Sequence, residues 1–505
     1  MWAAADRNSH TLRRLGYLVR GLRAVLVAGG VCLSLATPAL GHVELSTTPG
    51  LVPGFRRAAT DYVSRCSARE PLQVHVQASE GDQVSVAGRK YRGRSFTAAV
   101  LRATGQSLTV KVHAPDGSVR RYYIRCLPRS FPNWSIRRHG NPQAQWYVTA
   151  PVTGLPGGYV AIFDSYGAPV WWWHATSSDY FPWDAKLLDN GVLAWGENFG
   201  SHFGWHSKAA YEVRRLDGRL IRLIRTSGHP TDVHDLEEMS NGDVLALTYA
   251  RRDNVDLSAY GGERHATVFD AEIQEITPRG KVVWRWNSRK HVSPSETSRR
   301  WWYDPARADE HPPAERGYDL LHVNSVQPDG DGIIVSARAL DAIFRIDRAT
   351  GKIDWKLGGS YVPGESLTVL RDASQPLLGG QHDARVWPDG TVSVYDNRSY
   401  TSGRPNAERF RIDPITRTAT LIGRITEPNV PVSLCCGSAR RLAAGDWVIC
   451  WGATGFITEQ TPSGAVVLEL HLGSNTESYR AQPIPPGRLA ASSLRRGMDR
   501  MAAPP

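Results

Sequence analysis

The sequence predicts an all-β protein in which a six-bladed β-propeller follows a small β-sandwich. Glycine and proline are abundant, at 47 and 32 of the 505 residues, whereas methionine occurs only 4 times. This composition favours many short strands joined by tight turns over long helices. From residue 183 onward a β-rich unit also recurs along the chain, and such internal repeats are typical of propellers.

The N-terminal segment 1–41 has the pattern of a secretion signal. Arginines up to Arg23 precede an apolar run over 24–35, and Ala39-Leu40-Gly41 supplies the small residues of a cleavage site. The run is short for a membrane span, so the segment is interpreted as a signal peptide, with an uncleaved signal anchor as the alternative. Both interpretations place the body of the protein outside the cytoplasm, either secreted or held at the membrane by this segment.

Residues 42–138 are predicted to form the β-sandwich, which has some resemblance to cadherin-like domains. Short runs alternate polar and apolar residues, as in Leu108-Thr-Val-Lys-Val-His, and turn signals such as Pro115-Asp-Gly separate them. A linker is expected over 128–142.

Five cysteines lie outside the signal segment. Cys66 and Cys126 flank the β-rich stretch, and a disulfide between them fits an oxidising compartment. One of Cys435 and Cys436 is expected to pair with Cys450, which leaves a buried and inert thiol.

The propeller is predicted over 145–482. Successive units start seven positions before a polar or small residue that is followed by glycine, and each continues with a second apolar strand. The starts are Trp183, His234, His322, His382 and, more weakly, Gly437. Two further strands follow in most units, which makes four antiparallel strands per blade.

Closure of the ring requires one more blade. Residues 158–164 and 169–173 supply its outer strands, and a C-terminal strand near 478–481 completes it, which gives a count of six with five or seven also compatible. The largest inserted loop, Ser288 to Tyr318, contains Trp301-Trp302-Tyr303. The remaining segment, 483–505, is interpreted as a disordered basic tail.

The first strand of each propeller blade lines the central channel, so residues in equivalent positions form a ring. His234, His322 and His382 should therefore converge at one end of the channel. Asn324 lies two residues after a ring histidine and faces the same side of a strand. Arg338 and Arg385 also fall close to the ring. Imidazoles, an amide and guanidiniums together favour binding of an oxyanion, because arginine can bind two oxygens at once and stays charged.

Around these residues the chain resembles the arylsulfate sulfotransferase family. The matching motifs are Asp232-Val-His-Asp, Leu320-Leu-His-Val-Asn, Ser336-Ala-Arg and Gly380-Gln-His-Asp-Ala-Arg. The resemblance covers about residues 145–480. It implies a six-bladed propeller that moves a sulfuryl group from an aryl sulfate donor to a phenolic acceptor, with no nucleotide sulfate donor and no other cofactor.

The same resemblance assigns roles to individual residues. His382 would be the nucleophile that becomes transiently sulfated. His322, Asn324 and Arg338 would hold the sulfuryl oxygens, and His234 would bind sulfate or transfer a proton. The loop that would select the acceptor, which includes Trp301 to Tyr303, matches no motif of the family, so the resemblance assigns it no residue roles. Ser438 is only a candidate for a hydroxyl group that the family has in this region.

The net charge of +11 does not indicate nucleic-acid binding. Much of it lies in the signal segment and the C-terminal tail, and no nucleic-acid recognition motif accompanies the rest. Three alternatives to a sulfotransferase remain. They are a metal site formed by the three histidines, a non-enzymatic binding propeller with the sandwich as an adhesion module, and a quinone-binding propeller.

Overall fold

The computed structural model describes residues 43–153, 157–177, 179–200, 204–298 and 316–503. The predicted signal segment and Trp301 to Tyr303 lie outside these residues. Among the helices within them, none is long and apolar enough to cross a membrane.

The first part of the chain forms two sheets around one hydrophobic core. The three-stranded sheet has the order β1 (Glu44–Thr48), β4 (Leu72–Gln77) and β6 (Ser95–Val100). The five-stranded sheet has the order β2 (Leu51–Val52), β3 (Asp61–Ser64), β8 (Val119–Cys126), β7 (Ser107–His113) and β5 (Gln83–Val86). Every second residue of β4 and β7 is buried, as expected for strands with one face on a core. Cys66 and Cys126 form the predicted disulfide, with their Cα atoms 5.3 Å apart.

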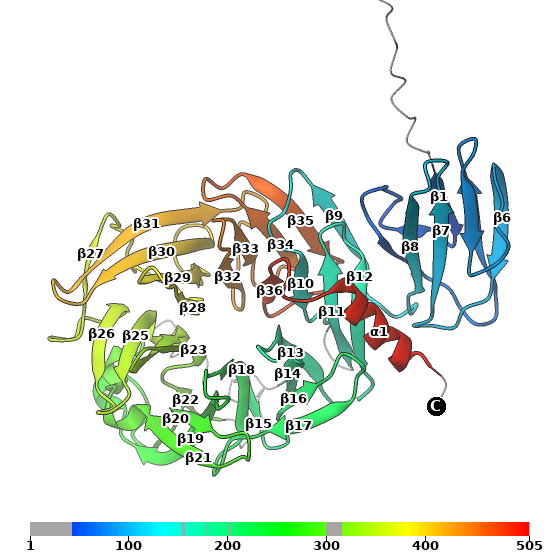
Figure 1. Cartoon of the computed structure of the whole chain (residues 1–505). Helices are drawn as coiled ribbons and strands as arrows, with labels where there is room; N and C mark the ends of the chain where they lie inside the picture. The colour runs from blue at the N-terminus through cyan, green and yellow to red at the C-terminus, as the bar shows by residue number, and fades with distance from the viewer. Residues whose placement is uncertain (1–42, 154–156, 178, 201–203, 299–315, 504–505) are drawn as a thin grey trace, which may run out of the picture. The chain divides into compact units, whose positions relative to one another are not determined.

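Six further sheets form a ring, shown in Figure 1 for the part of the chain that the structure describes. The first is β12 (Pro169–Ala175), β11 (Gly158–Asp164), β10 (Trp146–Thr149) and β36 (Ala481–Ile484). The second is β13 (Phe181–Leu187), β14 (Leu193–Asn198), β16 (Tyr211–Arg214) and β17 (Leu220–Ile224). The third is β15 (Trp205–His206), β18 (Thr231–Glu238), β19 (Val244–Val255), β20 (Ala266–Ile276) and β21 (Val282–Asn287), with β22 (Tyr318–Asp319) beside β20.

The other three sheets continue the ring. The fourth is β23 (Val323–Asp329), β24 (Gly332–Ala337), β25 (Ala342–Asp347) and β26 (Ile353–Gly358). The fifth is β28 (His382–Val386), β29 (Thr391–Asp396), β30 (Asn406–Asp413), β31 (Thr418–Thr426) and β27 (Thr368–Leu370). The sixth is β32 (Ser438–Arg441), β33 (Trp447–Cys450), β34 (Phe456–Gln460), β35 (Val466–Leu472) and β9 (Trp134–Arg138). The inner strands β13, β18, β23, β28, β32 and β36 contact one another in this order, and β36 returns to contact β13.

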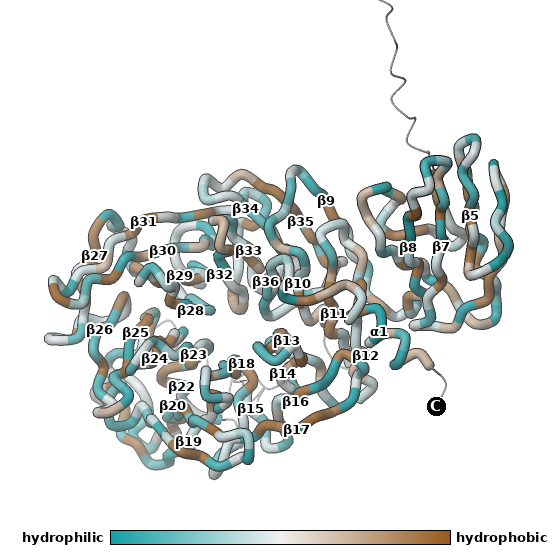
Figure 2. Tube along the Cα trace, viewed as in Figure 1, coloured by the Kyte–Doolittle hydropathy of each residue, from teal (hydrophilic) through white to brown (hydrophobic). Residues whose placement is uncertain are grey.

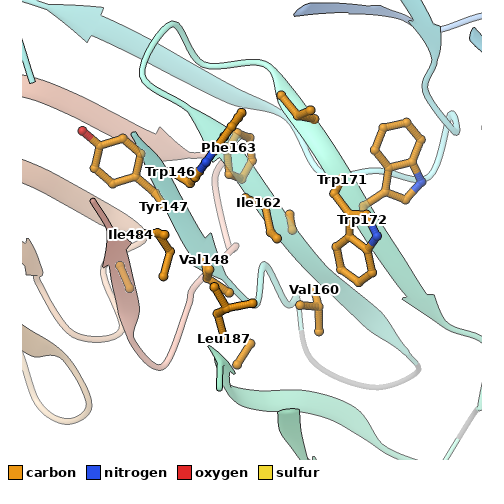
Figure 3. Packing of buried hydrophobic residues seen from close by; sticks show 14 of the residues in the cluster. Trp146, Tyr147, Val148, Val160, Ile162, Phe163, Trp171, Trp172, Leu187 and Ile484 are labelled. Carbon is orange, nitrogen blue, oxygen red and sulfur yellow. The ribbon is translucent and has the colours of Figure 1, made fainter. Parts of the chain in front are cut away.

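Strands from both ends of the chain close the ring. The C-terminal β36 pairs with β10, with Trp146 opposite Ile484, as the inner strand of the first sheet. Figure 3 shows how Val148 of β10, Ile162 of β11 and Ile484 pack together in this sheet. The N-terminal β9 pairs with β35, with Ile136 opposite Leu470. Propeller residues therefore begin before the predicted boundary at 145, and part of the expected linker is a strand.

The prediction of a disordered tail over 483–505 is wrong. Residues Ala491–Met501 form helix α1, which buries Leu494 and Met498 against the first sheet. These apolar side chains are four residues apart and so share one helix face. Arg495 binds the Asp61 carboxylate with both Nε and Nη2. The basic residues of this segment suggested a tail exposed to solvent, but one of them, Arg495, joins helix α1 to the sandwich.

Candidate active site

The ring residues lie where four consecutive inner strands change register. Pairing shifts after Trp183 in β13, after Asp232 in β18, after Val323 in β23 and after His382 in β28. His322 itself has a positive φ of 49°. A bulge inserts extra residues into one strand and changes the direction of its side chains. The repeated bulge therefore gives successive blades the same local means of directing a side chain into the channel.

The structure brings the three predicted histidines together, and Tyr479 lies beside two of them. The rings of His234 and His322 lie edge to face with centroids 4.7 Å apart. The Tyr479 ring centroid is 5.7 Å from that of His234 and 6.2 Å from that of His382. Trp183, the fourth ring position, stacks on Tyr479 at 4.8 Å. The exposed fractions of His234, His322 and His382 are 7%, 8% and 1%, so the imidazoles are largely shielded from water.

The tautomer of His382 is fixed by its neighbours. Asn397 donates its amide hydrogens to Ser433 Oγ and the Cys436 carbonyl, so its Oδ1 faces His382 Nδ1 at 2.8 Å. The Gly380 carbonyl lies 3.0 Å from the same nitrogen. Both groups only accept hydrogen bonds, so Nδ1 carries the proton and Nε2 carries the lone pair. The Cys436 amide donates to that lone pair at 3.2 Å.

The surroundings of His382 also oppose its protonation. Burial lowers the pKa of His382 well below its ordinary value, and the positive charge of Arg338 and the nearby His322 and His234 lower it further. An imidazole in this setting stays neutral at physiological pH, and its Nε2 keeps the character of a nucleophile.

The other two histidines each have a carboxylate behind the ring. Nδ1 of His234 lies 3.0 Å from both carboxylate oxygens of Asp232. Nδ1 of His322 lies 2.6 Å from Oδ2 of Asp319. A carboxylate on one ring nitrogen holds the imidazole in orientation and stabilises a proton on the other nitrogen. These two histidines are therefore suited to carry and return a proton, whereas His382 is not.

Arg338 and Asn324 occupy different environments. The half-buried Arg338 follows β24, donates its backbone N–H to the His322 carbonyl at 3.0 Å, and lies close enough to His382 to lower its pKa. Asn324 is fully buried, and its amide donates to the Gln381 carbonyl at 2.7 Å. The structure therefore brings Arg338 to the histidines, whereas Asn324 connects β23 to the residue before His382.

Arg385, predicted as a ligand for the oxyanion, is not in the site. Its Nε and Nη2 bind Asp383 and Asp235 at 3.0 and 2.9 Å, and its Nη1 donates to the Val326 carbonyl. The bulge after His382 turns the chain, so a residue three positions later lies in a buried ionic cluster instead.

This ionic cluster uses the aspartates that follow the ring residues. Arg480 binds Asp184 and Asp235 at 2.8 and 2.9 Å. Burial alone would raise the pKa of Asp383, but Arg440, Arg385 and Arg480 hold it at about 2. The cluster is internally paired, which indicates a structural role in joining the inner strands.

Two further expectations about this region are corrected by the structure. Cys435, Cys436 and Cys450 are all free thiols, and Cys450 donates to the Ser478 carbonyl at 3.3 Å. The Ser438 hydroxyl is buried and exchanges hydrogen bonds with the backbone of Ala481, so it serves the contact between β32 and β36.

Sequence reasoning missed four residues of the site, namely Tyr479, Asn397, Asp232 and Asp319. Asp232 lies two positions before His234 in the motif Asp232-Val-His-Asp, and Asp319 lies three positions before His322. Asn397 and Tyr479 are distant in sequence from the residues that they contact, and no local pattern marks them.

A known protein family matches the propeller region of the chain. A model of the arylsulfotransferase (ASST) family matches residues 152–483. No curated protein matches the chain.

Several solved structures are similar to the chain at low sequence identity. A protein of unknown function from Bacteroides caccae is 12% identical over 68% of this chain and 99% of its own, with a TM-score of 0.41. The β-propeller domain of Cps50 (Swd1) from Myceliophteria thermophila is 13% identical over 68% and 87%, with a TM-score of 0.37. Virginiamycin B lyase from Staphylococcus aureus is 13% identical over 72% and 91%, with a TM-score of 0.34.

Proposed function

The chain belongs to the arylsulfotransferase (ASST) family, and we propose that it moves a sulfuryl group from a phenolic sulfate ester to a phenol through a sulfated His382. The fixed tautomer of His382 is the observation that carries this proposal. Asn397 Oδ1 and the Gly380 carbonyl hold the proton on Nδ1, so the lone pair is on Nε2, and it attacks sulfur once the hydrogen bond from the Cys436 amide is exchanged for the substrate.

In the first half-reaction, Nε2 of His382 attacks the sulfur atom. An N–S bond forms while the S–O bond to the aryl group breaks, and the phenolate leaves with the electron pair of that bond. The positive charge on the sulfated ring is offset by the negative sulfuryl oxygens, and Nδ1–H keeps its hydrogen bond to Asn397. A proton from Nε2 of His234 or His322 then converts the phenolate to a phenol.

In the second half-reaction, the acceptor phenol returns a proton to the same imidazole as its oxygen attacks sulfur. The N–S bond breaks, and its electron pair returns to His382 Nε2. The net reaction transfers one sulfuryl group from one aryl oxygen to another. The histidine that gave up a proton in the first half-reaction regains one in the second. No nucleotide sulfate donor or other cofactor is required by this balance.

Charge on the equatorial sulfuryl oxygens must be stabilised during both steps, as in phosphoryl transfer. Arg338 is the cation suited to stabilise this charge, because it lies close enough to His382 for its positive charge to lower the pKa of that residue. We assign it, with Nε2 of His322, to binding of the sulfuryl oxygens. Asn324 is assigned a positioning role, since its amide is bonded to the Gln381 carbonyl next to His382.

The disulfide between Cys66 and Cys126 suits a protein that acts outside the cytoplasm. We propose an extracytoplasmic location, with small aryl sulfates and phenols from that compartment as substrates.

The test uses 4-nitrophenyl sulfate as donor and phenol as acceptor. Wild-type protein should release nitrophenol, and His382→Ala should abolish the release. His471→Ala is the matched control, because His471 is exposed on β35 in the sixth sheet, and it should retain full activity. Mass spectrometry of protein treated with donor alone should find one SO3 group on the peptide that contains His382. The proposal fails if wild-type protein releases no nitrophenol with any of several phenols, or if release survives His382→Ala.

A further inference from the structure

The outer strand of the second propeller sheet exposes apolar side chains. Among the residues that the structure describes, β17 is an edge strand that pairs with β16 alone. Leu220, Ile221 and Leu223 expose 41%, 47% and 40% of their surface. Figure 2 shows the hydrophobic colouring of β17 at the outer side of its sheet. Single exposed apolar residues are ordinary, but three within four positions of one edge strand indicate an interaction surface.

Arginines alternate with these apolar side chains. Arg219 and Arg222 lie within or beside the apolar run, and Arg215 and Arg225 flank it. All four side chains are exposed or half-buried. Asp217 is the one acidic residue between 215 and 225. We refer to residues 215–225 as the β17 surface.

The positive charge continues onto helix α1. A cavity of about 530 Å³ is lined by Arg215 and Ile221 of the β17 surface and by Arg496 and Arg500 of the helix. These two helix residues are four positions apart, so they lie on the same side of α1, and both are exposed. Arg500 forms a salt bridge with Asp217 at 3.8 Å, and its side chain remains 71% exposed.

The surface also reaches the outer strand of the third sheet. Arg222 donates to the carbonyl of Pro278, in the turn that leads into β21. Beyond that turn, Lys281 is exposed and Val283 exposes 49% of its surface. The interleaving of cationic and apolar side chains therefore extends over two adjacent blades.

We propose that the β17 surface docks the protein onto an anionic lipid bilayer. An interfacial site needs apolar side chains that enter the boundary of the acyl region and cations that reach the lipid phosphates, and this surface interleaves the two. A purely acidic and polar partner would use the arginines but would leave Leu220, Ile221 and Leu223 uncovered. His234 and His382 lie on the inner strands β18 and β28, and His322 directly precedes the inner strand β23. Since β17 is at the outer side of the ring (Figure 1), docking leaves the channel accessible.

The experiment measures sedimentation of the full chain with phosphatidylglycerol–phosphatidylcholine vesicles and with phosphatidylcholine vesicles. The test variant carries Arg219→Glu, Arg222→Glu and Arg225→Glu. The matched control carries the same change at Arg69, Arg120 and Arg121, which are exposed on the sandwich. At about 1 kcal/mol for each cation near an anionic surface, loss of three cations should by itself weaken binding about a hundredfold, and repulsion of the three new carboxylates adds to this.

Four results support docking. Wild type binds the anionic vesicles, high salt weakens the binding, the test variant binds at least about a hundredfold more weakly, and the control variant keeps the binding. Ile221→Ser with Leu223→Ser tests the apolar contribution and should also weaken binding while charge is unchanged. Nitrophenol release by each variant reports that the propeller is folded.

Other outcomes overturn the proposal. In the first, the test variant still binds the vesicles, as expected if only the N-terminal segment held the lipid. In the second, the test and control variants lose binding equally, as expected if net charge alone caused it. Binding to polyglutamate without binding to vesicles would indicate an acidic protein partner instead. A dimer that the test variant abolishes, in the absence of vesicle binding, would indicate pairing of two copies through β17.

Discussion

Asn397→Asp tests the hydrogen bond on which the nucleophile depends. The substitution places a carboxylate oxygen where Asn397 Oδ1 accepts the Nδ1–H of His382 at 2.8 Å. A negative charge that close to a buried imidazole stabilises its protonated form and raises the pKa of His382 by about 1–3 units. In the wild type, burial and neighbouring positive charge hold this pKa well below its ordinary value. The wild type should therefore keep a neutral His382, and its activity, into mildly acidic solution.

The variant should lose activity at a higher pH than the wild type. Protonated His382 has no lone pair on Nε2, so kcat/KM falls about tenfold for each pH unit below the raised pKa. A rise of two units thus gives about a hundredfold lower kcat/KM at the acidic end of the profile and a smaller change at alkaline pH. The measurement is the pH dependence of kcat/KM for 4-nitrophenyl sulfate at saturating phenol.

The substitution also has a structural cost that must be separated from the pH effect. Aspartate cannot donate to the Cys436 carbonyl, and an unsatisfied buried acceptor costs about 1–3 kcal/mol. Urea unfolding of the variant measures that cost directly. Asn241→Asp, in an exposed turn, adds the same charge elsewhere and should leave the profile unchanged. If the acidic limbs of Asn397→Asp and wild type coincide, the proposed contact between Oδ1 and Nδ1 is refuted.

Two predictions concern stability rather than chemistry. Arg385→Met leaves Asp235 and Asp383 without one of their buried partners and should lower the free energy of unfolding by about 3 kcal/mol; a change below about 1 kcal/mol in urea unfolding would contradict the ionic cluster. Joint replacement of Cys66 and Cys126 by alanine opens a loop with a sequence separation of 60 and should cost the sandwich about 4 kcal/mol. Calorimetry should find its transition lowered, and an unchanged transition would count against a contribution of the disulfide to folding.

The sequence was informative where a local pattern repeats. The spacing from a ring residue to its turn glycine located four inner strands, because each blade must bury the same face and turn at the same point. It was misleading at the ends of the chain. β9 becomes a strand only because β35, far away in sequence, is there to pair with it, and the segment predicted as a disordered tail contains helix α1. The closing strand predicted near 478–481 is present as β36 (Ala481–Ile484).

The residues of the site show the same contrast: those fixed by the repeat were predictable, and those fixed by tertiary contacts were not. His234, His322 and His382 were predictable because equivalent positions in a propeller form a ring whatever their chemistry. Arg385 was misplaced because a bulge intervenes, and strand periodicity cannot anticipate a bulge. Asn397 could not be found at all, since its role depends on two acceptors near residue 435 that fix the orientation of its amide. The difference between the three imidazoles is therefore set by tertiary contacts. Carboxylates support two of them, whereas an amide oxygen and a carbonyl keep the third neutral and nucleophilic.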